Sequence, residues 1–107
     1  MQYKFFVYCP DEEKLIQKII DVASEKGAGV YGNYSHVAFV THGNGYWVSE
    51  EGAHPVEGEI GKQTKSKNAR IEMTCPAKKI DEIVHAIKTV HPWEQVDIEC
   101  MRLSTTK

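Results

Sequence analysis

The sequence predicts a single α+β domain with the element order β-α-β-β-α-β. Its 107 residues fit one domain and little more. A strand-like run that ends in Cys-Pro and leads into a helical pattern occurs twice, at Cys9-Pro10 and at Cys75-Pro76. Two further strand-like runs complete the set. This repeated unit predicts a mostly antiparallel sheet with both helices on one face, the ferredoxin-like or split β-α-β arrangement.

The first half of the chain shows the two periodicities clearly. Alternating apolar residues predict the first strand: Tyr3, Phe5, Val7 and Cys9. A helix is expected over residues 11–26, and its apolar stripe is Leu15, Ile16, Ile19, Ile20 and Ala23. Gly27 supplies the left-handed residue that commonly ends a helix.

The second half repeats this order. A strand is expected over residues 35–42, continuing through Tyr46 and Trp47, and the Gly43-Asn44-Gly45 centre predicts a bulge or, as the alternative, a tight hairpin. The third strand carries Ala69, Ile71, Met73 and Cys75, the second helix covers residues 77–90, and the last strand carries Val96, Ile98 and Cys100.

The sheet face opposite the helices is predicted to be partly apolar. Four apolar residues lie out of phase with the helix-facing set: Phe6, Tyr8, Ala38 and Val40. We expect another subunit to cover part of this face, making the protein a homo-oligomer. Scattered surface apolar residues are the alternative, and the polar Arg70, Glu72 and Thr74 favour it.

Charge, composition and missing motifs argue against several classes of function for this chain, and the first is binding to nucleic acids or membrane surfaces. Thirteen basic and fifteen acidic residues give a net charge of −2, which favours neither nucleic-acid nor membrane-surface binding. The N-terminus lacks a signal-peptide layout, and three widely spaced cysteines suggest reduced thiols, so a cytoplasmic protein is expected. No nucleophile–base motif is present, so the chain is not expected to be an enzyme.

Three segments carry residue types that a simple connecting loop does not require. The stretch over residues 27–36 is rich in Gly, Asn, Tyr and His, and its backbone could approach an anion, although a helix cap plus a loop explains it equally well. His91 to Glu94 is the second segment. The third, residues 49–62, is a long loop with acidic Glu50, Glu51, Glu57 and Glu59, and loops of this length are often functional.

Five histidines invite a metal hypothesis. His36, His91 and Glu94 could together bind a divalent metal ion or an anionic ligand if the fold brings them close, although their spacing is no metal signature. The predicted ligand site lies where the glycine-rich loop would approach the turn at His91. Its residues are Gly29, Gly32, Asn33, Tyr34, His36, His91 and Glu94.

These motifs resemble a known family. The matching residues are Gly27-Ala28-Gly29-Val30-Tyr31-Gly32-Asn33-Tyr34-Ser35-His36, Phe39, Gly43-x-Gly45, Pro55-x-x-Gly58-x-x-Gly61 and His91-Pro92-Trp93-Glu94. Over residues 2–102 the chain resembles the inserted PII-like, CutA-like domain of the YqfO, or Nif-three-like, family. The resemblance implies a ferredoxin-like fold, a homotrimer built around the sheets, and a dinuclear metal site that belongs to a separate, larger domain.

The sequence departs from the family at a few positions. Val37 stands where many relatives have Cys, Gln95 stands where a carboxylate is common, and Val48-Ser49 replaces a proline-containing turn. We therefore expect a homo-oligomeric module that binds a small ligand or metal, or a partner protein, without catalysis. The alternative is a small metal-dependent hydrolase acting through His36, His91 and Glu94.

Overall fold

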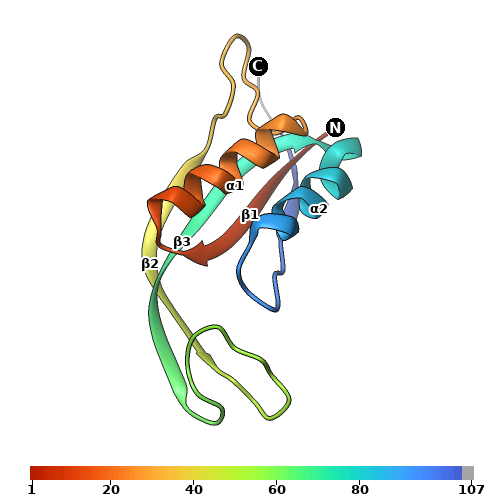
Figure 1. Ribbon diagram of the computed structural model, residues 1–107. Coiled ribbons are helices and arrows are strands. Elements are labelled where there is room, and N and C mark those ends of the chain that lie inside the picture. The colour runs from red at the N-terminus through yellow and green to blue at the C-terminus, as the bar shows by residue number, and fades with distance from the viewer. Residues whose placement is uncertain (105–107) are drawn as a thin grey trace.

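The computed structural model describes residues 1–104, which form one four-stranded antiparallel sheet with two α-helices on one face (Figure 1). The elements are β1 (Gln2–Pro10), α1 (Glu13–Glu25), β2 (Phe39–Val48), β3 (Gln63–Pro76), a 3-10 turn (Ala77–Lys79), α2 (Ile80–Val90) and β4 (Glu99–Leu103). The strand order β2-β3-β1-β4 places the two repeated strands side by side in the centre. The predicted ferredoxin-like α+β fold is confirmed.

The core lies between the sheet and the two helices. Every second residue is buried there from Phe5 to Cys9 of β1 and from Ala69 to Cys75 of β3. Ile19 of α1 and Ile83 and Ile87 of α2 close the core from the helix side. The predicted alternation is confirmed for both central strands, because each has one face against the helices.

The three cysteines are free thiols. Burial raises the pKa of the Cys9 thiol to about 12 and that of the Cys75 thiol to about 11, whereas Cys100 is exposed. A buried thiol in apolar surroundings stays protonated at neutral pH and is a poor nucleophile. Cys9 and Cys75 therefore act as core residues.

Strand β2 differs from the prediction in which of its residues face the helices. Val40 pairs with Ile71 and faces the helices with Ala38, whereas Phe39 points to the other side of the sheet and is 68% exposed. The assignment of Ala38 and Val40 to the uncovered face was wrong. Two adjacent apolar residues, Phe39 and Val40, leave the phase of a strand ambiguous, and only the pairing with β3 settles it.

The predicted bulge at Gly43-Asn44-Gly45 is also absent. These residues pair in unbroken register with Asn68, Lys67 and Ser66, and no hairpin turn forms there. The Asn68 side chain lies so close to Gly45 that a Cβ atom on Gly45 would collide with it. The glycine thus makes room for a neighbouring side chain and does not bend the strand.

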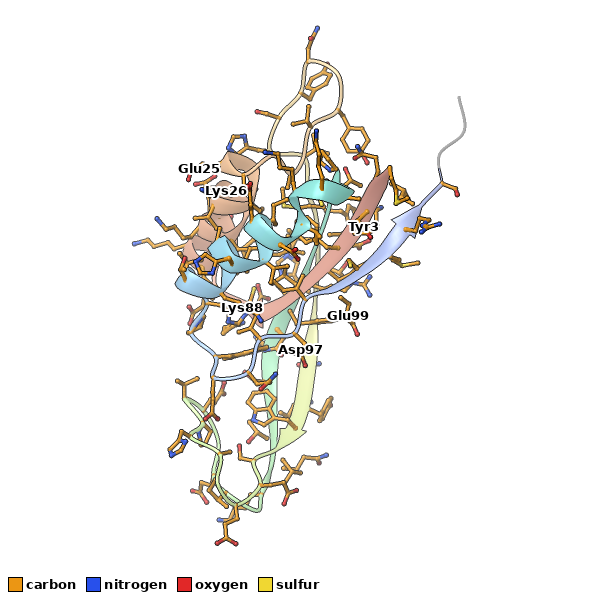
Figure 2. The ribbon with its side chains drawn as sticks, turned by 90° about the vertical axis from the view of Figure 1, so that its right-hand side faces the viewer. Tyr3, Glu25, Lys26, Lys88, Asp97 and Glu99 are labelled. Carbon is orange, nitrogen blue, oxygen red and sulfur yellow. The ribbon has the colours of Figure 1, made fainter. Side chains whose placement is uncertain are left out.

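The last strand begins later than predicted. β4 pairs with β1 from Glu99, opposite Phe6, and Cys100 is exposed. Val96 is buried and Ile98 packs against the core from the segment that leads into the strand. Figure 2 shows Asp97 on that segment and Glu99 at the start of β4. Apolar alternation here reflects packing of a connecting segment that does not pair with β1.

Strands β2 and β3 continue beyond β1 as a two-stranded arm. β1 pairs with β3 only as far as Asn68, whereas the β2–β3 pairing runs on to Val48 and Gln63. Residues 49–62, which we call the distal loop, join the two strands at the tip of the arm (Figure 1). No helix within residues 1–104 is both long enough and apolar enough to cross a membrane.

Candidate functional site

His91 holds the turn that follows α2 against strand β1. Its backbone N–H still donates to the Ile87 carbonyl, but its own backbone is extended, as expected for a residue before a proline. The residue as a whole is 8% exposed. Its Nε2 is 2.8 Å from the Tyr8 carbonyl oxygen, and the Trp93 backbone N–H donates to its Nδ1 over 3.2 Å.

These two contacts define the protonation state of His91. A carbonyl can only accept and a backbone N–H can only donate, so the proton sits on Nε2 and Nδ1 is the acceptor. Burial lowers the pKa of His91, while the hydrogen bond to the Tyr8 carbonyl opposes that effect. His91 is a neutral imidazole with both nitrogens engaged inside the chain, so it offers no free lone pair to a metal.

A pH dependence of stability follows from this buried imidazole. Its folded pKa lies below the unfolded value, so the unfolded chain binds more protons, and stability falls as the pH drops below about 6.5. We expect His91→Gln, which keeps a donor and an acceptor but does not titrate, to lose less of its free energy of unfolding than the parent between pH 7 and pH 5. Urea denaturation at both pH values measures this, and equal losses would contradict it.

Two tryptophans from distant parts of the chain meet beside this turn. Trp93 lies against the His91 ring, with ring centroids 5.0 Å apart, and its own ring is 6.1 Å from that of Trp47 on β2, tilted by 54°. Such tilted aromatic pairs stabilise the contact beyond simple burial. The turn at residues 91–95 is therefore packed against the β2–β3 arm.

The distal loop closes over the same region. The Glu94 carboxylate accepts hydrogen bonds from the His54 backbone N–H at 2.9 Å and from the His54 ring at 3.2 Å. These hydrogen bonds, the backbone one first, lower the pKa of Glu94, so it is ionised at neutral pH. At the base of the loop the Ser66 hydroxyl donates to Glu57 at 2.9 Å.

Between the arm, the distal loop and the turn lies a groove of about 440 Å³, which we call the aromatic groove. It is lined by Tyr8, Gly45, Tyr46, Trp47, Val48, Ser49, Glu50, Ala53, Pro55, Val56, Glu57, Asn68, Trp93, Glu94 and Gln95. Its size is that of a small-molecule site, and apolar or aromatic walls with a few polar groups are typical of such sites. The arrangement can enclose a flat or compact apolar group and face it with carboxylates.

The structure separates the predicted site residues into two places. His91 and Glu94 lie at the aromatic groove, where Glu94 is a lining residue. The glycine-rich loop lies at the other end of β1, where the Gly29 N–H donates to the carbonyl of Thr74, the residue paired with Lys4. Figure 1 shows this loop and the turn after α2 at well-separated positions. The predicted meeting of loop and turn does not occur within one chain.

The loop residues form a small structure of their own. Tyr31 and Tyr34 exchange two backbone hydrogen bonds, which makes residues 31–34 a tight turn with Gly32 and Asn33 at its centre. Gly32 has φ 54° and Gly29 has φ 75°, conformations that favour glycine. His36 lies 3.9 Å from Asp21 of α1, so its nearest acidic partner is not Glu94.

The predicted metal ligands are therefore not assembled in one chain. Within residues 1–104 no group of three or more His, Cys, Asp or Glu side chains lies close enough together to hold a metal ion. His36 pairs with Asp21, and Glu94 pairs with His54. Residue type alone suggested this ligand set, and in the structure its members make separate local contacts.

Several groove residues were not among the predicted site residues. Trp47 was predicted only as a strand residue. The sequence also did not predict that His54, which lies outside the lining, holds the lining residue Glu94. The signal that could have found them was the acidic distal loop, which was expected to be functional, together with the pairing of residues 39–48 with residues 63–72. That pairing carries the loop away from the sheet and then back to the turn at Glu94.

Comparisons with known proteins agree with this fold. No family model matches the chain. In sequence it is 30% identical over 92 residues to the GTP cyclohydrolase 1 type 2 homolog of Mycobacterium tuberculosis, covering 86% of this chain and 24% of that protein. It is 32% identical over 93 residues to the protein of the same name from Bacillus subtilis, covering 87% and 24%. The chain thus spans about a quarter of the length of these relatives.

Superposition on solved structures identifies the fold more specifically. A Bacillus cereus protein related to NIF3 superposes with a TM-score of 0.82 at 29% identity, over 97% of this chain and 26% of that one. The periplasmic divalent cation tolerance protein CutA from Archaeoglobus fulgidus superposes with a TM-score of 0.74 at 12% identity, over 100% and 88%, which shows a shared fold. The chain therefore corresponds to one segment of the NIF3-related proteins, with the fold of CutA, and the predicted resemblance to the Nif-three-like family and its CutA-like domain is confirmed.

Proposed function

We propose that this chain is a single-domain ligand-binding module whose site is the aromatic groove. The observation that carries the proposal is the position of Trp47 and Trp93, the two tryptophans of the chain, which both line a 440 Å³ groove between segments far apart in sequence. A groove with aromatic walls and few polar groups is the usual form of a small-ligand site. Glu94 and His91, two of the predicted site residues, belong to this region.

Binding without catalysis fits the chemistry of the surrounding groups. His91 has both ring nitrogens engaged, and Glu94 is held in its ionised form by His54. The raised pKa of the Cys9 thiol keeps that group protonated in the core. The relatives are four times as long as this chain, and we assign no activity of theirs to it.

We further propose that copies of the chain assemble through the sheet face opposite the helices, which we call the open face. Phe39 and Phe6 lie in one row on either side of Glu72, and Phe39 and Met101 are 68% and 57% exposed in the single chain. A hollow of about 310 Å³ beside Phe39 is lined on this face by Lys4, Glu72 and Thr74. Apolar side chains beside a hollow suit a second copy, and a homotrimer is the expectation from the sequence.

The groove is tested by the response of the two tryptophans to ligands. We expect at least one class among small amines, nucleotides and divalent cations to change the intrinsic fluorescence saturably and to raise the melting temperature. A ligand at 100 times its dissociation constant should add about 2.7 kcal/mol of stability. Trp93→Ala should abolish both effects. His85 is exposed on the surface of α2, and His85→Ala should keep both effects. No response to any class would contradict the proposal.

A further inference from the structure

The aromatic groove is lined by acidic side chains and carries no basic residue in its lining. Glu50, Glu57 and Glu94 line it, whereas no Lys, Arg or His is among the lining residues in the described part of the chain. All three are exposed residues, and carboxylates gathered at one groove repel anions and attract cations. A phosphate-bearing ligand is therefore disfavoured at this place.

The walls of the groove suit one kind of cation. Trp47 and Trp93 present rings tilted by 54° whose centroids are 6.1 Å apart, and Tyr46 also lines the groove. An aromatic ring attracts a cation positioned over its face, and tryptophan does so most strongly. The chain already contains such a contact on the arm, where the Lys65 Nζ lies 5.9 Å from the centre of the Tyr46 ring.

A metal ion fits these walls poorly. Hard divalent cations require several oxygen ligands at once, and indole faces supply none. The carboxylates of Glu94 and Glu57 already accept hydrogen bonds from His54 and Ser66. An alkylated ammonium ion differs, because its charge is spread over apolar methyl groups that pack against indole rings.

We propose that the aromatic groove binds a small organic ammonium ion, with the positive group against Trp47 and Trp93 where they line the groove and facing the carboxylates of Glu50, Glu57 and Glu94. This inference rests on the proposed function of the groove and adds the chemical class of the ligand. The inference also argues against GTP, which the name of the relatives mentions, as the ligand of this groove. Its triphosphate would meet three carboxylates and no basic lining residue.

Choline and 3,3-dimethylbutan-1-ol form a matched pair of probes, since they have nearly the same shape and differ in charge. Intrinsic fluorescence is a site-specific readout here, because both tryptophans of the chain line the groove. We expect choline to bind about 5-fold to 30-fold more tightly than the neutral alcohol, the range that a cation–π contact in a partly desolvated site supports. GTP and inorganic phosphate should leave the fluorescence unchanged.

Charge variants test the carboxylates. Glu50→Gln removes one negative charge from the lining and should reduce the preference for choline over the alcohol at least 2-fold. Glu25→Gln removes the same charge from the exposed end of α1, which Figure 2 shows far from the distal loop, and should leave the preference unchanged. A thermal melt of each variant checks that the fold is kept.

The outcomes separate the two proposals. Equal affinity for choline and the alcohol, or binding of GTP in the groove, would overturn the ammonium assignment and leave the groove as a ligand site. An equal effect of Glu50→Gln and Glu25→Gln would overturn the assignment of the carboxylates. No fluorescence response to choline, the alcohol, GTP or divalent cations would overturn both proposals.

Discussion

Replacing His91 with alanine is expected to lower the free energy of unfolding by about 2 to 4 kcal/mol. His91 is 8% exposed, and its imidazole joins the Tyr8 carbonyl to the Trp93 backbone N–H. Alanine would leave both groups without this partner and open a cavity beside the Trp93 ring. Because the turn carries Trp93 and Glu94, the aromatic groove should lose its ligand response as well. Urea denaturation followed by circular dichroism measures the stability.

The control for this prediction is another histidine of the same region. His85 is exposed on α2, and His85→Ala should change the free energy of unfolding by no more than about 0.5 kcal/mol. EDTA should leave the parent protein's stability unchanged. A similar loss in both variants would contradict the structural role of His91, and a loss of the parent's stability after EDTA treatment would show that a bound metal ion contributes to it.

Replacing Phe39 with aspartate is expected to convert the proposed oligomer to a single chain. Phe39 is 68% exposed on the open face and pairs in register with Glu72. In an assembled protein the substitution would exchange a buried aromatic ring for a charge next to another carboxylate. Loss of the apolar contact alone costs about 2 kcal/mol, and burying the charge adds to this, so the dissociation constant should rise at least roughly 100-fold. Sedimentation velocity at micromolar concentration shows the change.

Two further variants make the assembly test specific. Phe39→Leu keeps an apolar side chain and should preserve the oligomer. Ile60→Asp adds the same charge at another half-exposed apolar position, on the distal loop, and should also preserve it. A parent protein that sediments as a single chain at every concentration, or an Ile60→Asp variant as dissociated as Phe39→Asp, would contradict assembly through the open face.

The sequence predicted best where one side of an element is buried throughout. Ile71 and Met73 alternate with the polar Arg70, Glu72 and Thr74. Phe5 and Val7 keep the same period of two on β1, although Phe6 between them is apolar, and the burial of all four fixes the phase of both central strands. β2 gave no such signal, since its glycines carry no side chain and Phe39 and Val40 are both apolar. Only its pairing partner on β3 decides which of the two faces the helices.

The candidate site was predicted in part for a related reason. His91 and Glu94 stand in a compact motif with Trp93, and that motif does form one turn. Its partners come from 40 or more positions away, as in the hydrogen bonds between His54 and Glu94. Contacts of this kind depend on how far the β2–β3 arm extends beyond β1, which local spacing does not encode. His36 and His91 likewise lie apart within one chain, which their spacing in the sequence could not show.

The most direct test of the aromatic groove as a binding site is a proton–nitrogen correlation spectrum of the protein labelled at its two tryptophans. The indole signals of Trp47 and Trp93, assigned with Trp47→Phe and Trp93→Phe, should shift together as choline is added and should saturate with one shared dissociation constant. Two indole signals that stay in place while choline, 3,3-dimethylbutan-1-ol, GTP and divalent cations are each raised to millimolar concentration would contradict the account.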